Sequence, residues 1–269
     1  ERGSRVVNWC PRCQTAIADS EVEYWDETDY SIYVKFPVIG EENTFIVIWT
    51  TTPWTIPANV AVAVNPTFQY SKVRAWKEGR SEILIMASDL VESVLKTGRY
   101  QDYELMGVLS AQQMQELSYE HPLGEMVPRQ KQIVHGVYAA DFVTAENTGC
   151  VHIAPGHGLE DYELGLDHHL EIFCPVGEDG RYTEQAGEKY QGLYVKEADS
   201  LVIADLEEKG RLLAQGRLAH RYGHCWRCKT PIIFIATSQW FLRISDLRDK
   251  MLDEVSKVTW YPEWAGSAR

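Results

Sequence analysis

Two Cys-x-x-Cys pairs constrain this sequence more than any other feature. Cys10 and Cys13 lie near the start of the chain, and Cys225 and Cys228 lie near its end. Each pair can present two thiolates from one tight turn, and four thiolates suit a tetrahedral zinc ion. We therefore predict one structural zinc, held by both ends of the chain, that closes a neck. The alternative is two unconnected thiol pairs or a redox motif, which usually precedes a helix in a βαβ unit.

Composition and charge exclude several classes of protein. The 269 residues are 45% hydrophobic and 24% charged, enough for a core of one large or two small domains. The net charge of −13 makes the chain a poor general binder of nucleic-acid phosphates, so any such contact must be local. No apolar run reaches the roughly 18 residues of a membrane span, and the start lacks the apolar core of a signal peptide. We expect an excised, cytoplasmic domain without a membrane partner.

Apolar runs bounded by Pro, Gly and Asn predict many strands and few helices, without βαβ regularity. This pattern favours a mixed α and β fold, a β-barrel-like body decorated with helices. We expect one domain over 1–269, with a β-rich core at about 25–214 and a zinc-bound neck made by 1–24 with 215–269. A Gly-rich stretch at 176–193 predicts a surface loop or hairpin. The predicted strands are 31–36, 44–49, 60–64, 83–86, 149–153 and 231–235; the predicted helices are 88–98, one capped by Ser110 with Gln113, and about 197–209.

The first candidate site is the threonine-rich stretch from Trp49 to Asn59. Thr50, Thr51 and Thr52 end a predicted buried strand, and two prolines follow that we expect to forbid a helix. The resulting rigid turn would hold hydroxyl and amide side chains, together with free backbone amides, at a strand end. Such a turn suits a polar, uncharged ligand. Consecutive threonines are equally typical of an ordinary edge strand.

The second candidate site runs from His152 to Tyr162 through a glycine-rich turn. Asp161 would lie in the first turn of a helix, where the amide dipoles favour an ionised carboxylate that can pair with an ammonium group. His157 stands between two glycines that allow close backbone approach. Asp161 as a simple helix cap and a metallohydrolase built on these side chains remain as alternatives, although no His-Glu-x-x-His helix is present. Cys150 and Cys174 are expected to be small core residues.

These segments identify a resemblance that covers essentially the whole chain. The chain resembles the editing domain of isoleucyl-tRNA synthetases, the connective insertion within the catalytic Rossmann fold of class I synthetases. Related valyl and leucyl enzymes carry Thr-Thr-Arg-Pro where this chain has Thr51-Thr52-Pro53-Trp54, which favours the isoleucyl member. The HIGH and KMSKS signatures of the ATP-binding synthetic site are absent. The motifs that carry the resemblance are Val7–Cys10, Trp49–Asn59, Tyr119–Leu123, Gly149–Tyr162, His224–Cys228, Thr230–Phe234 and Gln239–Phe241.

The resemblance implies hydrolysis of isoleucine tRNA that carries valine, with valyl-adenylate as an open second substrate. A synthetic pocket rejects a side chain one methylene smaller by only a modest factor, so a second site must remove the error. By position, Asp161 would anchor the α-ammonium, His152 would limit the side-chain pocket, and Thr52 would help to orient water. The remaining implied substrate-binding residues are Trp49, Thr50, Thr51, Thr55, Asn59, His157 and Tyr222.

The implied partners are the 3′ end of the tRNA and the catalytic domain of the parent synthetase. A basic cluster near the second cysteine pair either touches phosphate or is a solvated zinc knuckle. An editing domain of a valyl or leucyl enzyme and a non-hydrolytic tRNA-docking module are the alternative functions. The cluster consists of His220, Arg221, His224, Arg227 and Lys229.

Overall fold

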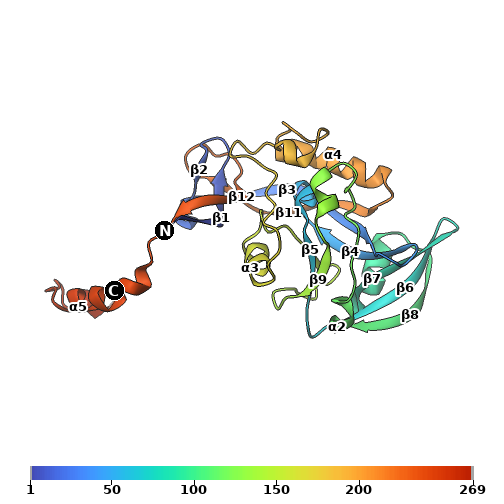
Figure 1. Cartoon of the computed structure of the whole chain (residues 1–269), viewed down its shortest axis with the longest axis horizontal. Coiled ribbons are helices and arrows are strands. Elements are labelled where there is room, and N and C mark those ends of the chain that lie inside the picture. The colour runs from blue at the N-terminus through green and yellow to red at the C-terminus, as the bar shows by residue number, and fades with distance from the viewer. Residues whose placement is uncertain (1, 268–269) are drawn as a thin grey trace. The chain divides into compact units, whose positions relative to one another are not determined.

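The computed structural model describes residues 2–267, and strands dominate it (Figure 1). The strands are β1 (Arg2–Cys10), β2 (Thr15–Ala16), β3 (Val22–Pro37), β4 (Thr44–Thr50), β5 (Ala61–Val64), β6 (Gln69–Lys77), β7 (Arg80–Ala87), β8 (Asp102–Ser110), β9 (Gly136–Ala139), β10 (Cys150–Ile153), β11 (Leu212–Cys225) and β12 (Ile233–Trp240). The α-helices are α1 (Val91–Thr97), α2 (Ala111–Met114), α3 (Leu159–Asp167), α4 (Val195–Glu208), α5 (Arg248–Ser256) and α6 (Trp264–Ser267).

Contacts divide the chain into two compact units. The larger unit is Val6–Ala236, and the smaller unit combines Glu1–Arg5 with Thr237–Arg269. The smaller unit contains α5 and α6, neither of which we predicted. The boundaries that we expected from the sequence, a core at about 25–214 and a neck from both ends, stay a prediction.

The strands form three open sheets rather than a barrel. Their orders are β11-β3-β4-β7-β6-β8, β10-β5-β9 and β12-β1-β2. Within the described residues β11 and β8 are free edges of the large sheet, so the expected barrel-like closure is wrong, while the mixed α and β class is confirmed. Alternating hydrophobicity reports that a strand is half-buried, but it carries no information on which edge strands meet.

The predicted elements are present, and several more accompany them. All six predicted strands and the helices α1 and α4 lie where the apolar pattern indicated, and Ser110 and Gln113 form the expected capping box before α2. The strands β6, β8 and β11 were missed because their polar residues hide the alternation. Segment 176–193 is a loop with isolated bridges, but Tyr182 and Tyr190 are buried in the core, so it is more than a surface loop.

Strand β4 separates two cores and thereby orients the first candidate site. Phe45 and Val47 pack on one face with α1, whereas Ile46 and Ile48 pack on the other face in the main core. Because side chains alternate along a strand, Thr50 ends the strand on the side of Ile46 and Ile48. The candidate site therefore opens beside the main core.

Candidate functional site

One cavity of about 210 Å³ gathers most of the predicted site residues from four distant segments. The end of β4 with the turn after it, the stretch from the end of β10 to the start of α3, the strand β11 and the strand β12 all contribute to it. Of the predicted residues, Trp49, Thr51 and Asn59 do not line it. The lining residues are Thr50, Thr52, Trp54, Thr55, His152, Ala154, His157, Asp161, Tyr222 and Phe234.

The backbone amides of the turn that follows β4 already donate hydrogen bonds within the protein. The Thr52 N–H donates to Thr50 Oγ1 at 3.0 Å, and the Thr55 N–H donates to Thr52 O at 3.0 Å. The Trp54 N–H donates to Asp199 Oδ1 on α4 at 2.8 Å. We expected free backbone amides in this turn, and for these three residues that expectation is wrong. The hydroxyl of Thr52, by contrast, makes no hydrogen bond to any described residue.

The two prolines of this turn do not prevent a helix, contrary to our expectation. Pro53–Ala58 form the 3-10 helix η2, with Pro53 at its first position. A first-turn residue needs no intrahelical partner for its N–H, and the fixed φ of proline suits that position. The turn therefore has a helical conformation, and its rigidity stays a prediction.

His152 is held by hydrogen bonds at both ring nitrogens. Thr55 Oγ1 lies 2.8 Å from Nε2, and Asn59 Nδ2 lies 3.1 Å from Nδ1. Burial lowers the pKa of His152 to about 3, and the neighbouring His157 adds to the shift. His152 is therefore a neutral, immobilised wall of the cavity. Asn59 is fully buried behind it.

Asp161 lies in the first turn of α3, as predicted, and points back to the end of β10. Its Oδ2 accepts a hydrogen bond from the Ala154 N–H at 2.8 Å, and no described residue donates to its Oδ1. Burial raises the pKa of Asp161 to about 6, against the lowering effect of that hydrogen bond. A Cβ at Gly158 would lie 2.7 Å from the Asp161 carboxylate, so the glycine allows this close approach. Asp161 is ionised at neutral pH and has one oxygen open.

Two aromatic side chains that line the cavity each carry a buried polar atom without a hydrogen-bond partner. Trp54 and His157 pack edge to face with ring centroids 5.1 Å apart. The Nδ1–H of His157 donates to Phe234 O at 2.9 Å, while His157 Nε2 and Trp54 Nε1 are buried without a hydrogen-bond partner. Buried polar atoms without partners are costly and rare, so a ligand that pairs with them would bind favourably.

Cys174 is not the plain core residue that we expected. It is half-buried, and burial raises the pKa of its thiol while the charge of His157 lowers it, with a net lowering. The pKa of His157 is raised in turn, because interactions with Cys174 and Phe234 outweigh its burial. Cys150 is buried, as predicted.

Four contributors to the site were not predicted, one of them Ala154, whose N–H holds Asp161. Trp54 and Phe234 lie in segments that we singled out, but no role was assigned to them. Asp199 anchors the turn from α4, and burial raises its pKa to about 7. An aspartate at an inward position of an amphipathic helix, next to Ala198, was the available signal.

Four cysteines converge at a separate position within the larger unit. The thiol sulfurs of Cys10, Cys13, Cys225 and Cys228 all lie within 4.8 Å of one another, and Cys10 Sγ lies 3.3 Å from Cys228 Sγ. Zinc–sulfur bonds of about 2.3 Å in a tetrahedron place sulfurs about 3.8 Å apart, so this donor set fits a closed zinc site.

The two cysteine turns have the same construction. The Gln14 N–H donates to Cys10 O and the Lys229 N–H donates to Cys225 O, both at 2.8 Å. Gln14 and Lys229 both adopt positive φ, 49° and 61°. Each turn therefore presents its two thiols in the same way, although the turns are some two hundred residues apart in the sequence.

The basic cluster beside the second cysteine turn is largely neutralised. His220 lies 2.9 Å from Asp29, and Lys229 lies 2.7 Å from Glu23. His224 pairs with Glu27 at 2.8 Å, and Arg227 lies 3.8 Å from Glu21. Glu21 ends the short 3-10 helix η1 (Asp19–Glu21), and the other acids come from β3, which runs beside β11. The arrangement favours the solvated-knuckle interpretation over a phosphate-binding patch.

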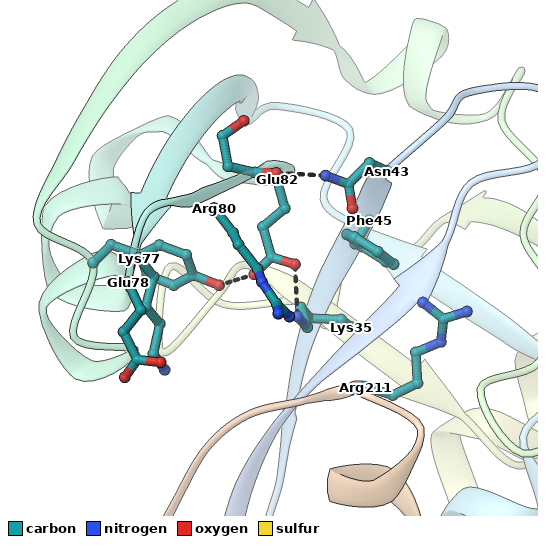
Figure 2. Close-up of a pocket in the computed structure, with 11 residues that line it drawn as sticks. Lys35, Asn43, Phe45, Lys77, Glu78, Arg80, Glu82 and Arg211 are labelled. Atoms are coloured by element: carbon teal, nitrogen blue, oxygen red, sulfur yellow. Dashed lines mark hydrogen bonds and ion pairs between the residues drawn. The ribbon is translucent and has the colours of Figure 1, made fainter.

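A larger cavity, of about 550 Å³, has a different character (Figure 2). Its centre is an ion pair between Lys35 and Glu82 at 2.6 Å, and Tyr100 also donates to Glu82. Lys35 Nζ and the Arg211 guanidinium lie 5.1 and 5.2 Å from the centre of the Phe45 ring. None of the predicted site residues lines this cavity. Lys35 and Glu82 at its centre are paired with each other, whereas the smaller cavity is lined by most of the predicted site residues and is therefore the better candidate site.

The family model described as tRNA synthetases class I (I, L, M and V) matches residues 1–269. The chain belongs to this family. It is 71% identical to the isoleucine–tRNA ligase of Methanothrix thermoacetophila over 100% of this chain and 26% of the relative. It is 64% identical to the enzyme of Methanosarcina barkeri, over 99% of this chain and 25% of the relative. It is 62% identical to the enzyme of Archaeoglobus fulgidus, over 100% of this chain and 26% of the relative. The chain thus spans about a quarter of the length of these relatives.

A solved structure has a fold similar to that of this chain. The crystal structure of GlLeuRS-CP1 matches with a TM-score of 0.51 at 12% identity, over 68% of this chain and 97% of that one. The resemblance inferred from the sequence motifs is therefore confirmed. Among the described residues, no helix has the length and apolar character needed to cross a membrane.

Proposed function

We propose that this chain hydrolyses the ester bond of isoleucine tRNA that carries valine. The carrying observation is the cavity itself, in which an ionised carboxylate, an immobile histidine and unpartnered buried polar atoms converge. Relatives of 62–71% identity named isoleucine–tRNA ligase support the choice of tRNA and amino acid. Valyl-adenylate shares the valine and the ammonium group, and it remains a second substrate to test.

Asp161 binds the α-ammonium of valine in this proposal. Its open Oδ1 offers a charge-assisted hydrogen bond, and its Oδ2 is already held by the backbone of Ala154. Because the carboxylate is fixed before the ligand arrives, little conformational entropy is lost on binding. The alternative that Asp161 is only a helix cap is less favoured, since its hydrogen bond comes from Ala154, directly after β10, and not from the α3 amides.

His152 excludes isoleucine by shape. Both of its ring nitrogens are engaged and its pKa is about 3, so it has no free lone pair to accept a proton or bind a metal ion. These contacts disfavour both a general-base role and the metallohydrolase alternative. A rigid ring that overlaps an added methyl group discriminates by repulsion.

The aminoacyl ester is already activated, so orienting one water molecule against its carbonyl suffices for hydrolysis. The unbonded hydroxyl of Thr52 orients this water, and the Trp54 indole N–H is the donor left for the carbonyl oxygen. The neighbouring backbone amides are occupied, so side chains replace them. No covalent intermediate is required.

Zinc has a structural role in this proposal. Cys10, Cys13, Cys225 and Cys228 would fill all four positions of the ion, which leaves none for a substrate. The ion would join the turn after β1 to the turn after β11.

The rest of the synthetase is the expected protein partner. In the smaller unit, α5 exposes Met251, Leu252 and Val255, and Trp240 is 83% exposed. Exposed apolar side chains gathered on one segment mark an interaction surface. We propose that the other three quarters of the parent chain cover them.

The decisive experiment incubates the 269-residue chain with valyl- and isoleucyl-esters of isoleucine tRNA. Release of valine from valyl-tRNA, with isoleucyl-tRNA left intact, supports the proposal. Binding of both tRNAs without release of either amino acid would instead support a non-hydrolytic docking module. Parallel assays use valine tRNA that carries threonine and leucine tRNA that carries isoleucine. They separate the isoleucyl member from its valyl and leucyl relatives.

A further inference from the structure

The segment Tyr119–Leu123 carries part of the family resemblance but does not line the candidate cavity. It lies instead against the turn 53–59. Tyr119, only 1% exposed, donates its hydroxyl to Asn59 Oδ1 at 2.6 Å. His121 Nε2 lies 2.9 Å from Ile56 O, and Gln130 donates to Pro57 O at 2.7 Å. A buried polar wall therefore braces the turn from behind.

The hydrogen bonds of Asn59 have only one consistent direction. Its Oδ1 accepts from Tyr119, and its Nδ2 donates to Ala61 O at 2.8 Å. The second Nδ2 hydrogen faces His152 Nδ1 at 3.1 Å, and Ile153 O lies farther from the same nitrogen at 3.4 Å. An amide nitrogen cannot accept a hydrogen bond, so His152 Nδ1 must be the acceptor.

The direction continues through His152 to the threonine floor of the cavity. A neutral imidazole whose Nδ1 accepts carries its proton on Nε2, which therefore donates to Thr55 Oγ1 at 2.8 Å. The Thr55 hydroxyl is then free to donate to Thr52 O at 2.8 Å. Hydrogen bonds thus run in one sense from Tyr119 through Asn59, His152 and Thr55 to Thr52.

We propose that Tyr119 is a positioning residue for selectivity: through Asn59 it sets the tautomer and ring orientation of His152, and through His152 the direction of the Thr55 hydroxyl. Reversing any link leaves a buried donor facing a donor or an acceptor facing an acceptor, which is costly. If His152 carried its proton on Nδ1, Thr55 would have to turn its hydrogen towards Nε2 and release Thr52 O. The selectivity part of this inference rests on the proposed function, whereas the tautomer part does not.

The test is ¹⁵N NMR of the histidine side chains at neutral pH in the parent chain and three variants. The parent should show His152 as a single Nε2–H tautomer. Asn59→Asp places an acceptor opposite Nδ1, so a proton should appear there. Tyr119→Phe removes the hydroxyl alone and should give a mixture of tautomers. Tyr70→Phe is the matched control, because its buried hydroxyl donates to Gly149 O at 3.0 Å and does not touch Asn59.

Deacylation of valyl- and isoleucyl-tRNA by the same variants tests the link to selectivity. Tyr119→Phe should lower the ratio of the two rates about tenfold, and Tyr70→Phe should leave it unchanged. A parent-like tautomer in Tyr119→Phe overturns the inference, as does an equal loss of both rates together with thermal stability. A changed tautomer with an unchanged ratio overturns its selectivity part. If the parent chain releases no valine, the proposed function fails, but the tautomer of His152 still decides whether Tyr119 has a positioning role. If Asn59→Asp does not fold, the comparison of Tyr119→Phe with the parent chain is enough to decide it.

Discussion

The cysteine cluster and the candidate cavity are both assembled from segments far apart in the chain, yet they are completed in different ways. The cluster presents four identical ligands from two turns of the same construction, and they converge on one point. The cavity presents unlike groups from four segments and leaves Trp54 Nε1, His157 Nε2 and one oxygen of Asp161 without partners. A single ion can complete the first site. The second site leaves several unlike polar groups open at once.

The largest effect that we predict comes from removing a ligand of the cysteine cluster. Cys225→Ser should abolish zinc binding, which is worth on the order of 10 kcal/mol in small zinc domains, and should lower the melting temperature strongly. Elemental analysis and thermal unfolding measure these outcomes. Cys150→Ala removes a buried thiol outside the cluster and should retain about one zinc per chain. A reduced parent chain without zinc would contradict the structural assignment.

Within the cavity, the largest predicted effect is that of Asp161→Asn. Loss of a charge-assisted contact with the ammonium costs about 2–4 kcal/mol, so valyl-tRNA deacylation should fall about 30- to 1000-fold. Glu160→Gln is the matched control, since Glu160 is an exposed carboxylate in the same turn of α3. Circular dichroism should show both variants folded. Unimpaired hydrolysis by Asp161→Asn would place the anchor elsewhere.

His152→Ala should produce a gain of activity. If the ring excludes the extra methyl group of isoleucine, its removal relieves overpacking worth roughly 1–3 kcal/mol. Hydrolysis of isoleucyl-tRNA should then rise about tenfold to a hundredfold, while valyl-tRNA is still hydrolysed. Single-turnover deacylation with both substrates measures this change. Loss of valyl-tRNA hydrolysis with no gain on isoleucyl-tRNA would refute the steric role.

The smallest predicted effect is a pH dependence. Burial raises the pKa of Asp161 to about 6, so this carboxylate is ionised above that pH and becomes protonated as the pH falls through it. The ammonium anchor is lost with the charge, and kcat/KM for valyl-tRNA should fall about tenfold from pH 7 to pH 5. The profile of Asp161→Asn should lack this step. A flat profile in the parent chain would mean that the ionised carboxylate is not needed.

Much of this protein can be predicted from local sequence. The strand at 44–50 follows from its apolar run, the cap at Ser110 from its partner Gln113, and the helix start at Asp161 from its turn. The paired cysteine spacings predicted the cluster, and the family motifs predicted seven residues of the cavity. The strand, the cap, the helix start and each cysteine pair depend on side chains only a few positions apart, so a short window of sequence contains the information.

Other features depend on partners that are remote in the chain. The edges of the large sheet stay open, the basic residues of β11 meet the acids of β3, and Asp199 of α4 occupies the Trp54 amide. Asn59 looked like a ligand-binding residue, but its buried hydrogen bonds place it behind His152. Whether a polar atom is satisfied or left open depends on which distant donor or acceptor faces it, and the tertiary fold alone decides that.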